Sequence, residues 1–171
     1  MIKNKRLIKA LTIMLVMMMS VVLLSGCETT SNKDKNKNET QAYEEPVKNM
    51  IEGLSEANSE KFLKAFPDFI SSYMKTMFTD DYLSETVKKA EEEYGSNLTM
   101  SYKVTDKKDI SEEALKEMQD EVKESFNKEI NISKGYVLTV EVTTKGDNDE
   151  DTETDDFKVY EIDGNWYLLA L

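Results

Sequence analysis

The spacing of apolar residues changes at Gly95, and this change restricts the fold more than any other feature of the chain. Before Gly95, apolar side chains recur every three or four residues, which places them on one face of a helix. Examples are Val47, Met50, Ile51, Leu54 and Ala57. After Gly95 they alternate with polar residues, which is typical of a strand with one buried face. Examples are Leu98, Met100, Tyr102 and Val104. The chain therefore combines helices with half-buried strands.

The helical part is divided by residues that begin or end helices. Pro46 suits the first turn of a helix, where its missing N–H costs nothing. Ser59 and Thr79 can cap two further helices, and Pro67 ends or kinks the chain between them. Gly95 stops the last of these helices. We therefore expect several short amphipathic helices between residues 46 and 94.

The part after Gly95 is predicted to hold strands and one more helix. The expected order is a strand at 98–104, a helix at 114–126, a strand at 136–142, a long acidic loop, and strands at 157–162 and 166–171. The spacing from Asp109 to Glu112 fits a capping box for the helix. Asp163-Gly164-Asn165 gives a strong signal for a hairpin turn. This order predicts an α+β fold with an antiparallel sheet on one side.

Two short segments resemble the NTF2-like (cystatin-like) superfamily, and most closely its lipoproteins of unknown function. They are Asn58-Ser59-Glu60-Lys61-Phe62 and the closing Val159…Asp163-Gly164-Asn165-Trp166-Tyr167. The resemblance covers residues 42–171 and implies a curved sheet wrapped around N-terminal helices, with a cone-like cavity between them. Enzymes of this superfamily commonly place an Asp–His pair in the cavity. This chain has no histidine, so no catalytic residue is carried over.

The N-terminus has the three parts of a bacterial lipoprotein signal. Residues 1–9 are basic, and Ala10–Leu24 is an apolar run of 15 residues, the length of a signal-peptide core. Leu24-Ser25-Gly26-Cys27 then resembles the lipobox. This pattern predicts a signal peptide at 1–26, cleavage between Gly26 and Cys27, and a lipid, including palmitate, on Cys27. The alternative is an uncleaved signal anchor, although a stable membrane span usually needs about 20 apolar residues.

The residues after the lipobox predict a tether and a single folded domain. Glu28–Gln41 contains no apolar cluster and is expected to be disordered. Residues 27–41 would therefore hold a domain at 42–171 near the outer face of the cell membrane. Fully extended, the tether could reach about 45–50 Å.

Composition excludes several classes of function. The chain has no histidine and one cysteine, Cys27, which is expected to carry lipid. Ser–His–Asp and Cys–His catalysis and histidine-containing zinc sites are therefore excluded. The net charge of −12 divides into +4 for residues 1–26 and −16 for the remainder. A domain this acidic repels a phosphate backbone, so nucleic acid is excluded as a partner. No cofactor is expected.

Catalysis by a serine–lysine pair needs neither histidine nor cysteine, so composition does not exclude it. Ser72 and Lys75 have the Ser-x-x-Lys spacing of penicillin-binding proteins, which places both on one helical face. Ser125 and Lys128 match equally well, and neither Ser-Asp-Asn nor Lys-Thr-Gly accompanies them. We interpret both pairs as surface positions.

The acidic segment is the remaining candidate for a metal site. It has seven acids among the ten residues 147–156, and Asp147, Asp149 and Asp151 stand at positions 1, 3 and 5 of an EF-hand-like register. Thr152 replaces the turn glycine, and Lys158 replaces the bidentate glutamate. We therefore interpret the segment as a solvated acidic loop that lacks a specific calcium site.

The sequence leaves three functions open. The leading hypothesis is a non-enzymatic binding or accessory module of the cell envelope, with an unidentified small ligand or envelope protein as partner. The second is an enzyme that uses carboxylate and tyrosine groups in the cavity. The third is a protein-interaction domain that uses the face of the sheet. The aromatic side chains, Trp166 included, lie mostly at core spacing and are interpreted as packing.

Overall fold

The computed structural model describes residues 41–169. The predicted signal peptide, Cys27 and the tether up to residue 40 lie outside the described residues. Across residues 41–169, no helix combines the length and apolar character that crossing a membrane requires.

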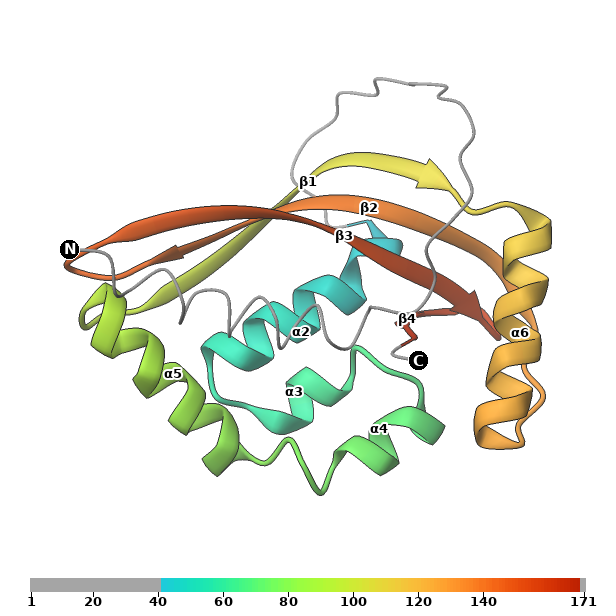
Figure 1. The fold of residues 1–171 in the computed structure, drawn as a ribbon, viewed down its shortest axis with the longest axis horizontal. Helices are drawn as coiled ribbons and strands as arrows, with labels where there is room; N and C mark the ends of the chain where they lie inside the picture. The colour runs from blue at the N-terminus through green and yellow to red at the C-terminus, as the bar shows by residue number, and fades with distance from the viewer. Residues whose placement is uncertain (1–40, 170–171) are drawn as a thin grey trace. The chain divides into compact units, whose positions relative to one another are not determined.

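A four-stranded antiparallel sheet carries helices on its concave side (Figure 1). The elements are η1 (Ala42–Glu44), α2 (Glu45–Ser55), α3 (Ser59–Leu63), α4 (Asp68–Met74), α5 (Asp80–Tyr94), β1 (Thr99–Asp109), α6 (Glu112–Phe126), β2 (Ile132–Lys145), β3 (Glu150–Ile162) and β4 (Asn165–Leu168). The strand order is β1-β2-β3-β4, so each strand pairs with its neighbour along the chain. The predicted α+β class, with N-terminal helices and an antiparallel sheet, is confirmed.

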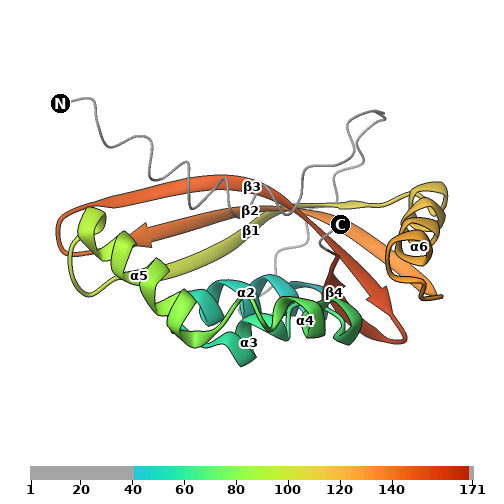
Figure 2. The same ribbon diagram turned by 60° about the horizontal axis from the view of Figure 1, so that its bottom comes forward.

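One face of the sheet, called the inner face below, is covered by α2 to α5 (Figure 2). Its centre is the main core, where Leu138, Val140, Phe157 and Val159 have no exposed surface. These residues alternate along β2 and β3 as the period of two requires. Helix α2 contacts both β1 and β4, so it spans the width of the sheet.

The opposite face, called the outer face, is covered only at one end, by α6. Leu115 of α6 packs there with Ile132, Tyr160 and Ile162 in a second core cluster. Gly135 makes this approach possible, because a Cβ atom at this position would lie 2.8 Å from Leu115 Cδ2. The sheet is thus covered on both sides where α6 packs and on one side elsewhere.

The predicted capping residues are correct for α5 and wrong for α3. Thr79 caps α5 as predicted, accepting a hydrogen bond from the Tyr82 N–H at 3.2 Å, and Gly95 ends that helix with φ 92°. The cap at Ser59 is wrong by one residue. Asn58 accepts from the Lys61 N–H at 2.9 Å and is the actual cap of α3.

The capping box predicted from Asp109 to Glu112 is also wrong. Asp109 is still paired with Tyr136 in the sheet, so it cannot cap a helix. Ser111 caps α6 instead, accepting from the Ala114 N–H at 3.3 Å. The hairpin turn is confirmed, with positive φ at Asp163 (51°) and Gly164 (80°), as a turn of this type requires.

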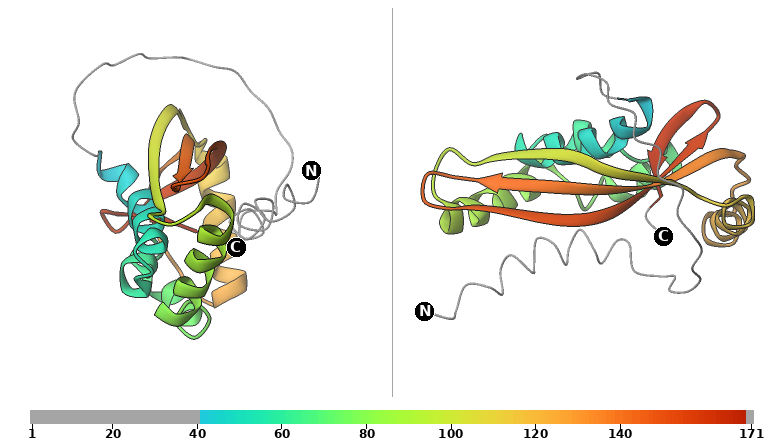
Figure 3. Two further views of the ribbon diagram at one scale, coloured as in Figure 1. Left: turned by 90° about the vertical axis from the view of Figure 1, so that its left-hand side faces the viewer. Right: turned by 90° about the horizontal axis from the view of Figure 1, so that it is seen from above.

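The predicted acidic loop is wrong, because most of it belongs to β3, which begins at Glu150. Acidic residues have low strand propensity, but here their partners on β2 compensate. The Thr143 and Thr152 hydroxyls hydrogen-bond at 2.8 Å, and Lys145 pairs with Glu150 at 2.7 Å. Strand β2 correspondingly starts at Ile132 and runs to Lys145, so β2 and β3 form one long hairpin (Figure 3).

Strand β1 contains a β-bulge that changes which side chains face inward. Val104 pairs with Val140, but the next residue of β2, Thr139, pairs with Asp106, so Thr105 is the extra residue. Beyond the bulge, Lys107 pairs with Leu138 and shares its inner face. Without the bulge, Asp106 would occupy that position.

Candidate functional site

The candidate metal ligands Asp147, Asp149 and Asp151, which from the sequence we interpret as lacking a specific calcium site, do not converge in the structure. The Asp147 carboxylate accepts a hydrogen bond from Asn97 Nδ2 at 2.9 Å. Asp149 and Asp151 each accept from the backbone N–H of the following residue, at 2.9 and 2.8 Å. Asp151 lies in β3 and the other two lie before it. No group of three or more His, Cys, Asp or Glu side chains in residues 41–169 is arranged to hold a metal ion.

The two serine–lysine pairs lie on the surface. Ser72, Lys75, Ser125 and Lys128 are all exposed. The Lys128 ammonium lies 5.8 Å from the centre of the Phe69 ring, so it stacks on an aromatic side chain between α4 and α6. Neither pair has the buried, mutually oriented geometry that an activated serine needs.

The most distinctive group of side chains is an aromatic cluster at the end of the inner face, made of Tyr43, Tyr136 and Trp166. The Tyr136 and Trp166 rings are stacked, with centroids 5.0 Å apart and planes inclined by 13°. Tyr43 meets both rings edge-on, at 5.2 and 6.1 Å. All three side chains are partly exposed, which distinguishes them from the core rings of Phe62, Phe66 and Phe78.

Three separate segments supply the aromatic cluster. Tyr136 lies on β2 and Trp166 on β4, and Trp166 is held by its pairing with Glu161 of β3. Tyr43 lies in η1, which contacts β3 and β4. The cluster therefore fixes the start of the folded chain onto the last strands of the sheet.

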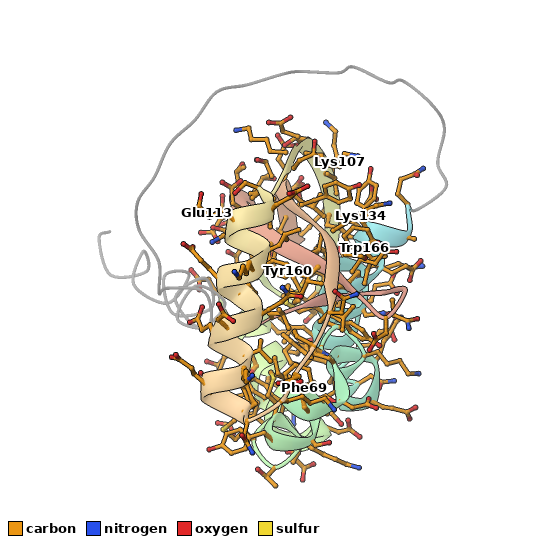
Figure 4. All side chains as sticks on the ribbon, turned by 90° about the vertical axis from the view of Figure 1, so that its right-hand side faces the viewer. Phe69, Lys107, Glu113, Lys134, Tyr160 and Trp166 are labelled. Atoms are coloured by element: carbon orange, nitrogen blue, oxygen red, sulfur yellow. The ribbon has the colours of Figure 1, made fainter. Side chains whose placement is uncertain are left out.

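Lys107 completes the cluster with a positive charge. Its Nζ lies 4.5 Å from the Tyr136 ring centre and 4.7 Å from that of Tyr43, within the range of cation–π attraction. The bulge at Thr105 places this lysine on the inner face, diagonally across from Tyr136. Figure 4 shows Lys107 and Lys134 at the same end of the sheet as Trp166.

Partial burial alters the acid–base properties around the cluster. Burial raises the pKa of Glu44, and the nearby Lys107 charge opposes that rise. Burial is also the main cause that raises the pKa of Tyr43, with smaller contributions from Glu44 and Tyr136. Tyr43 therefore stays protonated at neutral pH and can donate a hydrogen bond.

The other end of the inner face is acidic. Burial, followed by the charges of Asp149 and Asp151, raises the pKa of Glu93 in α5. Burial and neighbouring acids raise the pKa of Tyr94 to about 12. Asp155, which pairs with Val140 on the inner face, has a pKa raised by burial and by Asp156. This end gathers negative charge against the C-terminal turn of α5.

The turn between β2 and β3 is bound to α5. The backbone N–H groups of Asn148 and Asp149 both donate to the Tyr94 carbonyl oxygen, at 2.8 and 3.1 Å. The Asp147 N–H donates to the Ser96 carbonyl oxygen at 3.0 Å. The acidic end is therefore a fixed part of the fold.

The uncovered part of the outer face is polar and internally paired. Thr139 donates to Asp156 at 2.7 Å, and Lys103 lies 3.8 Å from Glu141. With the Thr143–Thr152 and Lys145–Glu150 pairs, these contacts form a ladder across three strands. Such a face is well solvated and lacks the aromatic centre of a typical protein interface.

Sequence reasoning missed Tyr43 and Lys107 as members of a cluster. Tyr43 lies before the first helical repeat, so no periodic pattern includes it. Lys107 lies beyond the bulge, where alternation counted from Val104 assigns it to the wrong face. Trp166 and Tyr136, which are interpreted as packing, do stack on each other, but both are partly exposed and lie outside the buried core. Tyr73, also counted among the core aromatics, is 74% exposed.

The chain matches no protein-family model, and comparison with curated proteins and with solved structures finds no significant match.

Proposed function

We propose that this protein is a lipid-anchored, extracytoplasmic lipoprotein whose NTF2-like domain acts as a non-enzymatic binding or accessory module of the cell envelope. Cys27 carries the lipid, and residues 28–41 form the tether. The observation that carries the proposal is the lipobox Leu24–Cys27, placed shortly before a folded domain that begins at Ala42.

The side chains of the domain support binding better than catalysis. The aromatic cluster with Lys107 offers ring faces and a positive charge, groups that recognise a partner without exchanging protons. The element order of helices, a strand, a helix and three strands agrees with the NTF2-like resemblance. Because that superfamily includes enzymes and non-enzymes, the choice rests on the site.

A carboxylate–tyrosine enzyme is less well supported. The pKa of Tyr94 and that of Tyr160 are both raised to about 12, so neither phenol ionises readily as a base near neutral pH. Tyr160 is also buried beneath α6. The raised pKa values of Glu93 and Asp155 come from burial and from acidic neighbours, which explains them without a catalytic role.

The anchor is tested by metabolic labelling with a palmitate analogue in the native host. The wild-type chain should take up label, and Cys27→Ala should lose the label and its processing by signal peptidase II. Ser25→Ala is the matched control, because it keeps a small residue in the lipobox and should still be labelled. Labelling of Cys27→Ala equal to wild type would refute the anchor.

Non-enzymatic action is tested by replacing the chromosomal gene. A Glu93→Gln/Asp155→Asn variant removes the two inner-face carboxylates with raised pKa values while keeping their shape. We expect the strain that carries it to behave like the wild type and to lack any phenotype that deletion of the gene produces. A folded variant, verified by circular dichroism, that behaves like the deletion would favour the enzyme instead.

A further inference from the structure

We propose that the aromatic cluster, together with Lys107 and Lys134, docks the domain end-on against an anionic phospholipid surface. This inference rests on the proposed lipid anchor, and adds which end of the domain faces the membrane. The acidic end of the inner face then points away from the bilayer.

The position of Tyr43 along the chain is the first argument. Tyr43 lies in the first described turn and is a member of the aromatic cluster. Cys27 lies sixteen positions earlier. A coil of this length spans about 20 Å on average, so the anchor keeps the aromatic cluster close to the lipid.

The chemistry of the exposed groups is the second argument. Tyrosine and tryptophan combine an apolar ring with a polar tip and are enriched at membrane–water interfaces. Lysine beside them keeps its stem on the rings and its ammonium in water. Lys107 differs in that its ammonium itself lies over the Tyr43 and Tyr136 rings, which places the positive charge within the aromatic cluster.

The third argument is the positive charge of two lysines that form no close ion pair, although Lys107 lies near Glu44 and Lys134 lies opposite Glu161 in the sheet. In residues 41–169 no carboxylate oxygen lies within 4.0 Å of Lys107 Nζ or Lys134 Nζ, whereas Lys61, Lys123 and Lys145 are all paired. Lys107 and Lys134 are exposed. Each lysine close to an anionic leaflet strengthens contact by about fivefold.

The distance between the two ends is the fourth argument. Tyr136 and Thr144 share the inner face of β2 and pair with Val159 and Asp151 respectively. Eight residues of extended strand separate them by about 26 Å. That distance exceeds the Debye length of about 8 Å at physiological ionic strength. Repulsion between the acidic end and the lipid is therefore screened while the lysines touch the surface.

The single tryptophan makes the orientation measurable. Trp166 is the only tryptophan of the chain, so its fluorescence reports on the aromatic cluster alone. Lipidated full-length protein is reconstituted into vesicles of equimolar phosphatidylcholine and phosphatidylglycerol, with a nitroxide quencher on the headgroups. We expect headgroup nitroxides to quench Trp166 more strongly in these vesicles than in pure phosphatidylcholine vesicles, because docking brings the ring to the level of the headgroups.

Charge reversal provides the matched comparison. Lys134→Glu, at an exposed lysine without an ion pair among the described residues, should reduce quenching to the level seen in pure phosphatidylcholine vesicles. Lys107→Glu should do the same. Lys88→Glu makes the same change of charge on exposed α5 and should leave quenching unchanged.

The outcomes separate this inference from the anchor. Protein that fails to float with vesicles refutes the anchor and the docking together. Protein that floats but whose Trp166 is unquenched refutes the docking alone. Equal quenching of the Lys134→Glu and Lys88→Glu variants also overturns the docking, because a charge-dependent contact must distinguish them.

Discussion

The two ends of the inner face are built on the same strands yet differ in chemistry. One end has Tyr136 and Trp166 stacked under Tyr43 with a lysine above them. The other has Glu93, Asp149 and Asp151 gathered around Tyr94. Between them, Leu138 and Phe157 form a wholly buried centre. The shared core stabilises the fold, whereas the residues at the strand ends determine what each end can contact.

The largest expected effect comes from the shared centre. Phe157→Ala should lower the free energy of unfolding by about 3–5 kcal/mol, because it leaves a cavity between the two ends. Chemical denaturation followed by Trp166 fluorescence and by circular dichroism measures it. We expect the two signals to change together. Separate transitions would show that the aromatic and acidic ends fold independently.

Trp166→Ala is expected to have the next largest effect. Its ring is stacked but partly exposed, so we expect a loss of about 2 kcal/mol, below the range for a fully buried aromatic. Trp166→Phe keeps an aromatic ring and is the control. Thermal unfolding of residues 42–171, followed by circular dichroism, measures both. A loss as large as that of Phe157→Ala would mean that the aromatic cluster belongs to the core.

The acidic end should respond to pH in the opposite sense from a typical paired carboxylate. The pKa of Asp155 is raised in the folded state, so its ionised carboxylate destabilises the fold at pH values above that pKa. As pH falls, the penalty is relieved between the folded pKa and the ordinary value of 3.8. Asp155→Asn should therefore stabilise the domain by about 0.5 kcal/mol at neutral pH, with the gain vanishing below that window.

The control for this effect is Asp120→Asn, at an exposed position on α6. Its stability should follow the pH profile of the wild type. If Asp155→Asn destabilises the domain at neutral pH, the carboxylate has a stabilising partner that outweighs the cost of its burial.

Calcium should have the smallest effect. The carboxylates of Asp147, Asp149 and Asp151 are turned toward Asn97 and the backbone, so binding should be diffuse and weaker than about 1 mM at physiological salt. Calorimetric titration checks this expectation. A one-to-one micromolar isotherm that Asp149→Asn abolishes would show a specific site at this end.

Sequence patterns predicted the class of the fold because long periodic segments determine it. The caps at Thr79 and Gly95 and the turn at Asp163 followed from local chemistry that the structure keeps. The cap at Ser59 was wrong by one residue, since Asn58 can accept the same kind of hydrogen bond. Local signals therefore locate an element better than they locate its first residue.

The errors that matter for the site have non-local causes. The acidic residues from Glu150 form a strand because threonines and a lysine on β2 pair with them. Lys107 faces inward because of one extra residue in β1. Both outcomes depend on which residue of another strand lies opposite. A single sequence does not show which residues of two strands will lie opposite each other in the sheet.

Strand β1 is an edge strand of the sheet, and its bulge affects how two copies of this protein can contact each other. The proposed tether would confine copies to one plane, where an unprotected strand edge would template pairing between neighbours and lead to aggregation. The bulge at Thr105 interrupts the edge, and exposed Lys103, Lys107 and Lys108 line the same strand. A bulge and charged side chains on an edge strand both oppose regular pairing with a second edge. Edge-to-edge pairing of β1 between neighbouring copies is therefore disfavoured.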